Sequence, residues 1–571
     1  MKRNIPMQKR FAPLVLAAFA SGLTVSASAQ WQPHGVGVCT ANFAQVTPVA
    51  CSDGAGGVII AWSDARFGDG LDIYAQWLDQ DGVPQWTVDG VLVCAAPEAQ
   101  TSPVIVTDEA GGAIIAWDDR RFGNANVDVY AQRVSAAGST LWTPNGLAIC
   151  SAVNIQHNLV IARHGAGATI VWHDYRFNFN AADLYAQRVD DLGAAIWSVD
   201  GVAVTDAANH QGSPRIVGDG AGGAVVAWLD FRSGSQYDVY VQRLDNNGVG
   251  LWTFNGVALC TAANSKFNPE MVTDGAGGAI VVWQDYRDVG NPGIYAGRVD
   301  NAGFAVWSPV GVALCTAVGV QDVPAIASDG AGGAIAAWDD SRSGISIDMY
   351  AQQVSSSGVT GWATDGVAIC TAAASQTNPV VTPDGAGGAI VAWEDYRNSN
   401  ADIYARRVDA SGTTQWAVDG VVVSVTAGDQ WRPTMITDGA GGAIAAWMDE
   451  RYGIYQDIFS QRIPADGSVP TAIERTPTVS HLKLSPNFPN PFSEETSMDL
   501  DLPADANVSV EVYDVAGREV RSIEAIPVSA GTRHMTFDGR DDEGRLLPSG
   551  VYFYRVTANN STSTRKMVIE R

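Results

Sequence analysis

The sequence is short of basic residues: 35 Lys and Arg stand against 61 Asp and Glu, and the formal net charge is −26 at pH 7. Such a chain repels nucleic acid and anionic membrane surfaces, so neither is expected as a partner. After residue 29 it also lacks long apolar runs, and no segment reaches the roughly 18 apolar residues that cross a bilayer. We therefore expect no transmembrane segment.

The common signatures of catalysis are missing too. The sequence has no GxxxxGK[ST] phosphate loop, no GxSxG nucleophile elbow and no HExxH zinc motif. No residue is expected to be catalytic, and no spacing of His, Cys, Asp or Glu indicates a metal site. No cofactor is expected, although binding of calcium by so acidic a chain stays open.

Cysteine is scarce, and its seven copies do not form an even disulfide framework. Six of them occupy one position of a repeat, where the two remaining repeats carry Thr205 and Ser424; the six are Cys39, Cys94, Cys150, Cys260, Cys315 and Cys370. A position shared by Cys, Ser and Thr indicates a small buried side chain. A disulfide between Cys39 and Cys51 is a possible exception in an oxidising compartment.

The N-terminus is typical of a secretory signal peptide. Four basic residues precede an apolar stretch, and Ala27-Ser28-Ala29 matches a small-x-small cleavage site. We expect residues 1–29 to be removed and the product to be extracellular or on the outer cell surface.

Most of the remaining chain repeats with a period of about 55 residues. A glycine turn, exemplified by Asp329-Gly330-Ala331-Gly332-Gly333, recurs eight times and is followed each time by an apolar run ending in Trp. Periods of this length indicate a propeller or a solenoid. Within one repeat we expect four short strands, near residues 325–328, 334–338, 348–354 and 362–370, and no helix.

The ends of the repeat region favour a propeller over a solenoid. The last repeat stops after its third strand, and residues 31–39 have the Trp-to-Cys spacing of a fourth. The first segment is therefore expected to complete the last sheet, which removes an exposed sheet edge. The fold class that follows is all-β: an eight-bladed β-propeller over residues 30–463, a linker over 464–481 and a small Ig-like β-sandwich over 482–571.

Each repeat carries Trp-x-Asp-x-Arg after the apolar run. As a ring of guanidinium groups these arginines could bind anionic glycans or carboxylates; they are Arg66, Arg121, Arg176, Arg232, Arg287, Arg342, Arg397 and Arg451. Alternatively, the Asp caps the following turn and the Arg pairs with an acid of its own or the next repeat, for which the Asp opening the third strand is a candidate. Eightfold repetition favours this structural role.

A catalytic or binding site would break the symmetry of the ring, and the third repeat deviates most. His157, His173 and His210 are expected to lie on one face near two adjacent repeats. They form a candidate binding site, with divergent surface residues as the plainer alternative. A Gln-x-x-Pro motif between repeats, broken at Lys266 and Leu159, is expected to be structural, with Gln bonding buried backbone groups.

The C–D turns, such as residues 409–416, resemble the Asp-box of sialidase-type propellers, but both spacings are one residue longer. The resemblance supports the propeller and implies no sialidase activity.

The C-terminal segment carries the motifs PNFPNPF (486–492), YDVAGR (513–518), SGVY (549–552) and RKM (565–567). In this order they closely resemble the C-terminal sorting domain of the type IX (Por) secretion system, a sandwich akin to the FlgD Ig-like domain. The resemblance implies export across the outer membrane, with the type IX machinery as partner. The residues expected to carry the sorting motif are Asn487, Pro489, Asn490, Pro491, Phe492, Gly517, Arg518, Gly550, Tyr552 and Lys566. A FlgD-like domain without sorting duty is the alternative.

The sequence therefore predicts a secreted or cell-surface repeat protein whose ring binds a glycan or a surface protein. An extracellular hydrolase or lyase acting on polysaccharide, and a purely structural surface protein, are the alternatives.

Overall fold

The computed structural model describes residues 31–470 apart from positions 69, 166 and 454, and residues 483–571 apart from 485–486, 488, 503–505, 516, 529–530 and 559–560. The expected signal peptide and most of the expected linker lie outside the described residues. Within them every regular element is a strand.

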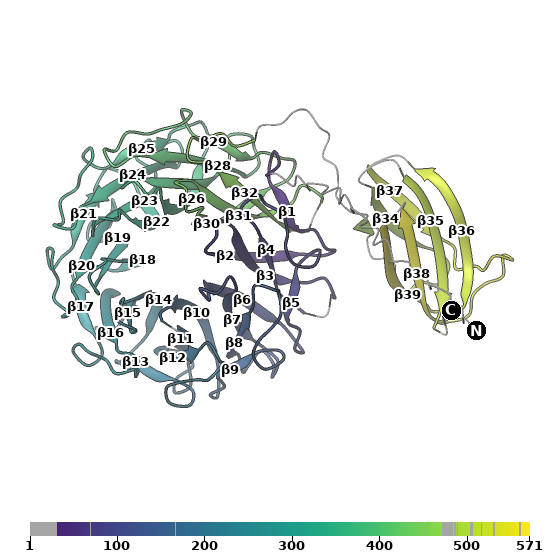
Figure 1. Ribbon diagram of the computed structural model, residues 1–571, viewed down its shortest axis with the longest axis horizontal. Coiled ribbons are helices and arrows are strands. Elements are labelled where there is room, and N and C mark those ends of the chain that lie inside the picture. Colours follow the sequence, from purple (N-terminus) through teal and green to yellow (C-terminus); the bar gives the residue numbers. More distant parts are fainter. Residues whose placement is uncertain are drawn as a thin grey trace, which may run out of the picture.

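Eight four-stranded antiparallel sheets form the larger part of the structure, and Figure 1 shows them arranged as a ring. We number them sheet 1 to sheet 8 in chain order. The innermost strands are β2 (Gln45–Ser52), β6 (Gln100–Thr107), β10 (Gln156–Arg163), β14 (Gln211–Gly218), β18 (Lys266–Thr273), β22 (Gln321–Ser328), β26 (Gln376–Pro383) and β30 (Gln430–Thr437). The second strands are β3 (Val58–Asp64), β7 (Ala113–Asp119), β11 (Gly167–Asp174), β15 (Ala224–Asp230), β19 (Ala279–Asp285), β23 (Ala334–Asp340), β27 (Ala389–Asp395) and β31 (Ala443–Asp449).

The third strands are β4 (Asp72–Leu78), β8 (Asp128–Val134), β12 (Asp183–Asp190), β16 (Asp238–Leu244), β20 (Gly293–Val299), β24 (Asp348–Val354), β28 (Asp402–Val408) and β32 (Asp457–Ile463). The outer strands are β5 (Val91–Cys94), β9 (Leu147–Cys150), β13 (Val202–Thr205), β17 (Val257–Cys260), β21 (Val312–Cys315), β25 (Val367–Cys370), β29 (Val421–Ser424) and β1 (Val36–Cys39).

The second strands hold the core. Each is an apolar run followed by Trp, and every residue of β3 and β23 is buried, as a strand packed on both faces requires. Neighbouring inner strands contact one another around the whole ring, and β2 contacts β30. Among the described residues the core of the ring consists of eight clusters, one between each pair of neighbouring sheets. The repeated four-stranded sheets that the sequence predicts are therefore present.

The N-terminal segment lies beside the last three strands. β1 pairs antiparallel with β32, which makes sheet 8 four-stranded in the order β1-β32-β31-β30. The Trp31 indole N–H donates to the carbonyl of Gln80 in sheet 1 at 2.9 Å. The two ends of the ring are thus joined by backbone pairing in sheet 8 and by a bond to sheet 1.

The inner strands begin about four residues earlier than predicted. They include the Gln-x-x-Pro segment, which the sequence placed in the connection between sheets. The register shifts within this segment, for example between Val46 and Val49, so the strand carries a bulge. One residue of the bulge has positive φ in every sheet: Thr47, Ser102, Asn158, Ser213, Asn268, Val323, Asn378 and Arg432. The segment is therefore strand with a bulge rather than loop.

The C-terminal residues form a separate two-sheet sandwich. One sheet contains β33 (Lys483–Leu484), β34 (Thr496–Leu502) and β37 (Gly531–Phe537), and the other contains β36 (Glu519–Val528), β35 (Ala506–Asp514), β38 (Gly550–Ala558) and β39 (Ser561–Ile569). A core that includes Leu500, Val510 and Tyr554 lies between them.

Candidate functional site

One face of the ring brings together three kinds of strand end. In sheet 1, Gln45 at the start of β2 lies beside Asp64 at the end of β3, and Asp64 lies beside Asp72 at the start of β4. The loops between second and third strands and the connections between sheets therefore share this face, which we call the loop face.

The eight predicted arginines all lie on the loop face, each bound to the Asp two residues before it. In sheet 6, Arg342 Nε donates to Asp340 Oδ1 at 2.8 Å and Nη2 to Oδ2 at 2.6 Å. Nη2 also donates to the carbonyl of Asp365, and the guanidinium lies 3.7 Å from the centre of the Tyr350 ring. All eight Asp–Arg pairs repeat this geometry, and the Arg side chains are 8–25 % exposed.

The aspartate of each pair is fully occupied. Asp340 also accepts the indole N–H of Trp338 and the backbone N–H of Arg342. The Arg therefore pairs with an acid of its own sheet, one of the two arrangements expected, but the acid is the Asp of its own motif and not the candidate that opens the third strand. The pair is joined by two parallel hydrogen bonds. A ligand anion would have to displace a buried carboxylate, which assigns these arginines to holding the loops.

The shared Cys, Ser or Thr position lies under the guanidinium groups. Arg342 Nη2 lies 3.2 Å from Cys315 Sγ, and Arg451 Nη2 lies 3.3 Å from Ser424 Oγ. A small side chain with an acceptor atom fits this buried place, which explains why the position accepts only these three residue types. All seven cysteines are free, so the possible Cys39–Cys51 disulfide is not formed.

The Gln of Gln-x-x-Pro binds the connection between sheets, as expected. Gln45 Nε2, for example, donates to the carbonyl of Phe43 at 2.8 Å. Lys266 takes this role in sheet 5: its fully buried ammonium donates to Asn264 O at 2.8 Å and pairs with Asp238 at 3.1 Å. At Lys266 the motif is therefore broken by a substitution that preserves the hydrogen bonds to the connection between sheets.

The symmetry of the loop face is broken by a run of aromatic rings over sheets 3, 4 and 5. The sequence singled out three of them, and the structure brings these three together: His173 lies between His157 and His210, with ring centroids 5.5 and 5.8 Å away. The full set, which we call the aromatic arc, is His157, His173, Tyr175, His210, Phe231, Tyr237, Phe267 and Tyr286.

Neighbouring rings of the aromatic arc contact one another without interruption. His157 stacks on Tyr175 at 5.6 Å with an interplanar angle of 12°, and Phe231 lies 4.8 Å from Tyr237. Phe267 meets Tyr286 edge-on at 5.3 Å. These separations are those of favourable aromatic pairs. Seven of the eight rings are partly exposed, and only His173 is buried.

The histidines of the arc are neutral at ordinary pH. Burial lowers the pKa of His157 and of His210, and it lowers the pKa of His173 to about 3. His173 Nε2 accepts the backbone N–H of Ser213, and His210 Nδ1 accepts that of Ala182. In neutral His210 the ring proton therefore lies on Nε2, which is a hydrogen-bond donor.

Sequence reasoning missed the other five rings. Tyr175, Phe231 and Tyr286 occupy one equivalent place, directly after the Asp of the motif, which we call the rim position. Its eight occupants are Ala65, Arg120, Tyr175, Phe231, Tyr286, Ser341, Tyr396 and Glu450. An alignment of the eight repeats at the rim position would have shown an aromatic residue in three successive repeats.

Carboxyl groups gather on another part of the loop face, in sheets 6 and 7. Asp322 and Asp339 are paired across β22 and β23. Burial, and then the charge of Asp322, raises the pKa of Asp339 to about 8. Glu394 accepts the amide of Asn378 at 2.9 Å and the backbone N–H of Arg432 at 2.7 Å. Among the described residues, no group of three or more His, Cys, Asp or Glu side chains is arranged to hold a metal ion.

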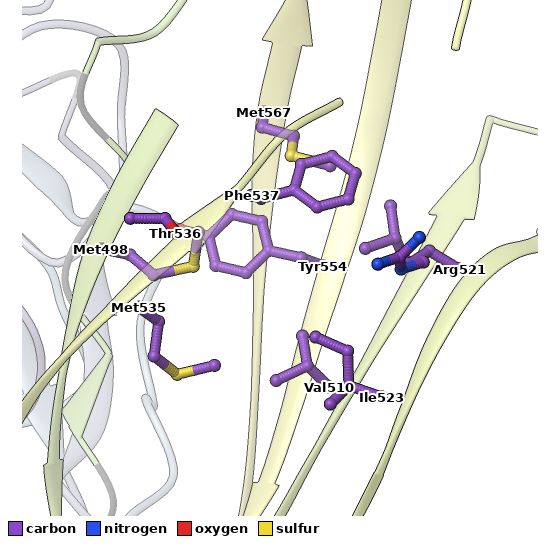
Figure 2. A pocket seen from close by; sticks show the side chains of 10 residues that line it. Met498, Val510, Arg521, Ile523, Met535, Thr536, Phe537, Tyr554 and Met567 are labelled. Atoms are coloured by element: carbon purple, nitrogen blue, oxygen red, sulfur yellow. The ribbon is translucent and has the colours of Figure 1, made fainter. Parts of the chain in front are cut away.

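A pocket in the C-terminal sandwich lies between its two sheets, and Figure 2 shows its lining. Met498, Met535, Met567 and Tyr554 surround it, with Arg521 at one side. Flexible methionine side chains commonly fill irregular gaps of a core. The pocket is therefore a gap in packing and lacks the convergent polar groups of a ligand site.

The expected sorting residues lie in this sandwich. Asn487 is buried and donates to Thr496 Oγ1 at 2.9 Å, and Asn490 Oδ1 accepts the backbone N–H of Val568 at 2.8 Å. Phe492 packs against Phe537, and Tyr552 donates to the carbonyl of Pro548. Gly517 has positive φ, and Arg518 pairs with Asp514. Pro489, Pro491 and Lys566 are exposed, and Gly550 begins β38.

Residues 488–562 match the model of the FlgD Ig-like domain. The basal-body rod modification protein FlgD of Salmonella typhimurium is 36% identical over 63 residues, which are 11% of this chain and 27% of that protein. The chain thus spans about a quarter of the length of the curated relatives it matches.

Two solved structures are similar to this chain. An ulvan lyase of family PL25 is 11% identical with a TM-score of 0.38, over 78% of this chain and 97% of the other. The α-L-arabinanase of Penicillium chrysogenum is 12% identical with a TM-score of 0.30, over 54% and 93%. These likenesses are distant and carry no argument about the site. The part of the chain that the structure describes has no helix with the length and hydropathy of a membrane span.

Proposed function

We propose that this is a secreted or cell-surface protein whose ring is a glycan-binding module. In this proposal residues 30–463 form an eight-bladed β-propeller closed by β1, residues 464–481 a linker, and residues 482–571 a type IX sorting domain that addresses the protein. The signal-like N-terminus and the C-terminal motifs support the export route. The match to the FlgD Ig-like domain supports the Ig-like fold of the C-terminal domain.

The aromatic arc is the observation that carries the binding function. Its rings offer apolar faces for the C–H surfaces of sugars, while the phenol groups of Tyr175 and Tyr286 and the Nε2–H of His210 can bond hydroxyl groups. Rings on three sheets suit several consecutive sugar units better than a single small molecule.

A glycan array tests the proposal on the full mature chain. It is run with calcium and again with a chelator, which also decides whether calcium contributes. Binding to a defined glycan class is expected. If no glycan binds under either condition and a protein ligand is retained instead, the glycan proposal is wrong.

A second candidate function is a polysaccharide hydrolase or lyase, and the carboxyl groups of sheets 6 and 7 favour it. Asp339 keeps its proton near neutral pH beside Asp322, and general acid catalysis uses such a group. Release of reducing ends from a polysaccharide, abolished by Asp339→Asn, would establish the enzyme. Glycan binding without turnover would leave the binding module.

The sorting role of the C-terminal domain has its own test. A chain truncated after residue 481, expressed in a bacterium with a type IX system, is expected to remain in the periplasm. Secretion of the truncated chain at the level of the full chain would overturn this part of the proposal.

A further inference from the structure

A basic residue, Arg120, lies on sheet 2, beyond the sheet 3 end of the aromatic arc. Arg120 occupies the rim position there, the place that Tyr175 holds in the neighbouring sheet 3. In both residues the backbone N–H donates to the carbonyl of the residue before the Gln of the inner strand: Arg120 to Ala99 at 2.9 Å, and Tyr175 to Ile155 at 3.0 Å. Phe231 and Tyr286 make the same bond to His210 and Ser265. The four residues therefore hold one equivalent place on four consecutive sheets.

Arg120 differs from the arginine that follows it. Arg121 is bound bidentate to Asp119, as in every motif. Arg120 makes no ion pair with any residue that the structure describes, and its guanidinium contact there is a 3.5 Å bond from Nη1 to the side-chain oxygen of Asn124. It is the only basic residue among the eight at the rim position. The nearby acid is Asp118: burial raises the pKa of Asp118 to about 7 and the charge of Arg120 lowers it in part, but the two form no ion pair.

Arg120 is electrostatically close to the arc. Its charge, after burial, is the next largest cause of the lowered pKa of His157, the first ring of the arc. The arc itself contains no carboxylate, and its histidines are neutral. A ligand lying across the arc would therefore meet a neutral platform over sheets 3 to 5 and a cation at the sheet 2 end.

We propose that Arg120 binds the acidic group of a glycan seated on the aromatic arc, so that the ligand is an acidic polysaccharide. A guanidinium binds a carboxylate or a sulfate through two parallel hydrogen bonds, and a neutral sugar offers no such partner. This inference rests on the proposed glycan-binding function. It adds the ligand class, which is uronate-bearing or sulfated, and the direction in which the ligand lies, with an acidic unit over sheet 2.

The test is a titration of the full mature chain with three defined hexasaccharides: oligogalacturonate, its neutral methyl ester, and a sulfated neutral-sugar oligomer. At least one acidic ligand is expected to bind about tenfold more tightly than the methyl ester, since a charged hydrogen bond contributes roughly this factor. Tighter binding of oligogalacturonate would indicate recognition of a carboxylate, and tighter binding of the sulfated oligomer would indicate recognition of a sulfate. The preference is expected to shrink as salt is raised.

Arg120→Gln is expected to remove the preference for the acidic ligand and to leave binding of the methyl ester unchanged. Arg432→Gln is the matched control, because Arg432 is an exposed arginine of the same face on sheet 8, away from the arc. If the Arg120→Gln chain keeps the preference, or if the wild type binds all three hexasaccharides equally, the inference is overturned and the glycan-binding proposal stands. If the wild type binds none of the three hexasaccharides and no glycan of the array, both fail.

Discussion

At the scale of single residues, the side chains that recur in every repeat have a structural role, and the side chains that occur once are the candidates for ligand binding. The Asp–Arg pairs recur with one geometry and fasten the loops of all eight sheets, so their repetition reflects stability. The chemistry that could select a ligand lies in residues that occur once, such as His157 and Arg120. This division separates variants that should unfold the ring from variants that should change only binding.

Arg342→Met is expected to destabilise the ring by about 3–5 kcal/mol, because it leaves the buried Asp340 carboxylate without its cation. Denaturant unfolding measures the effect. Arg432→Met, at an exposed arginine, is expected to stay within about 0.5 kcal/mol of wild type. Equal and small effects for both variants would show that the pairs do not hold the loops.

Asp339→Asn is expected to change how stability depends on pH. The raised pKa of Asp339, about 8, means that the folded state binds its proton more tightly than the unfolded chain does. Its contribution to stability is therefore complete below about pH 4 and is lost as pH rises through 8. The Asn variant keeps an acceptor for the neighbouring backbone and cannot ionise.

The measurement for Asp339→Asn is the midpoint of thermal unfolding at pH 4, 6 and 8. Relative to wild type, the variant should gain stability between pH 4 and pH 8. A constant difference across this range would show that Asp339 ionises normally in the folded ring.

At the scale of strands and loops, the sequence predicted the four strands of a repeat and their order, because each has its own apolar pattern and is bounded by turns. It did not predict the bulge of the inner strand. No glycine stands at its positive-φ position; residues as different as Thr47 and Val323 do. Only the pairing of the inner strand with its neighbour imposes that conformation.

The candidate site was predicted in part for a related reason. His157, His173 and His210 were found because they interrupt the repeat. Tyr237 lies in the loop before β16 and Phe267 lies in β18, and only the packing of neighbouring sheets brings them beside the histidines. The sequence spacing between residues of different sheets does not predict that they are in contact.

Val323→Asn is expected to stabilise sheet 6 by about 1 kcal/mol. A β-branched residue is strained at its φ of 45°, whereas Asn tolerates this region and stands there in sheets 3, 5 and 7. Denaturant unfolding measures the gain. Val225→Asn, in the buried second strand of sheet 4, serves as the contrast and should be strongly destabilising. A loss of stability in Val323→Asn would indicate that valine packs favourably there.

At the scale of the whole molecule, the ring depends on its two ends meeting. Deleting residues 30–40 removes β1, the Trp31 bond to sheet 1 and the carbonyl of His34 that Arg451 donates to. It leaves β32 with an open edge. We expect a lower melting temperature and exposure of sheet 8 to proteolysis, while Gln32→Ala, an exposed side chain, should change neither. An unchanged melting profile after the deletion would refute closure.

The central claim is that the unrepeated rings over sheets 3 to 5 bind a glycan. Its most direct test compares the dissociation constant of the best array ligand for wild type, for Tyr175→Ala with Tyr286→Ala, and for Tyr396→Ala. Tyr396 holds the same rim position on sheet 7, outside the arc, and is the matched control. The account predicts at least a tenfold weaker affinity for the arc variant and wild-type affinity for the control. Equal affinity in all three proteins would contradict it.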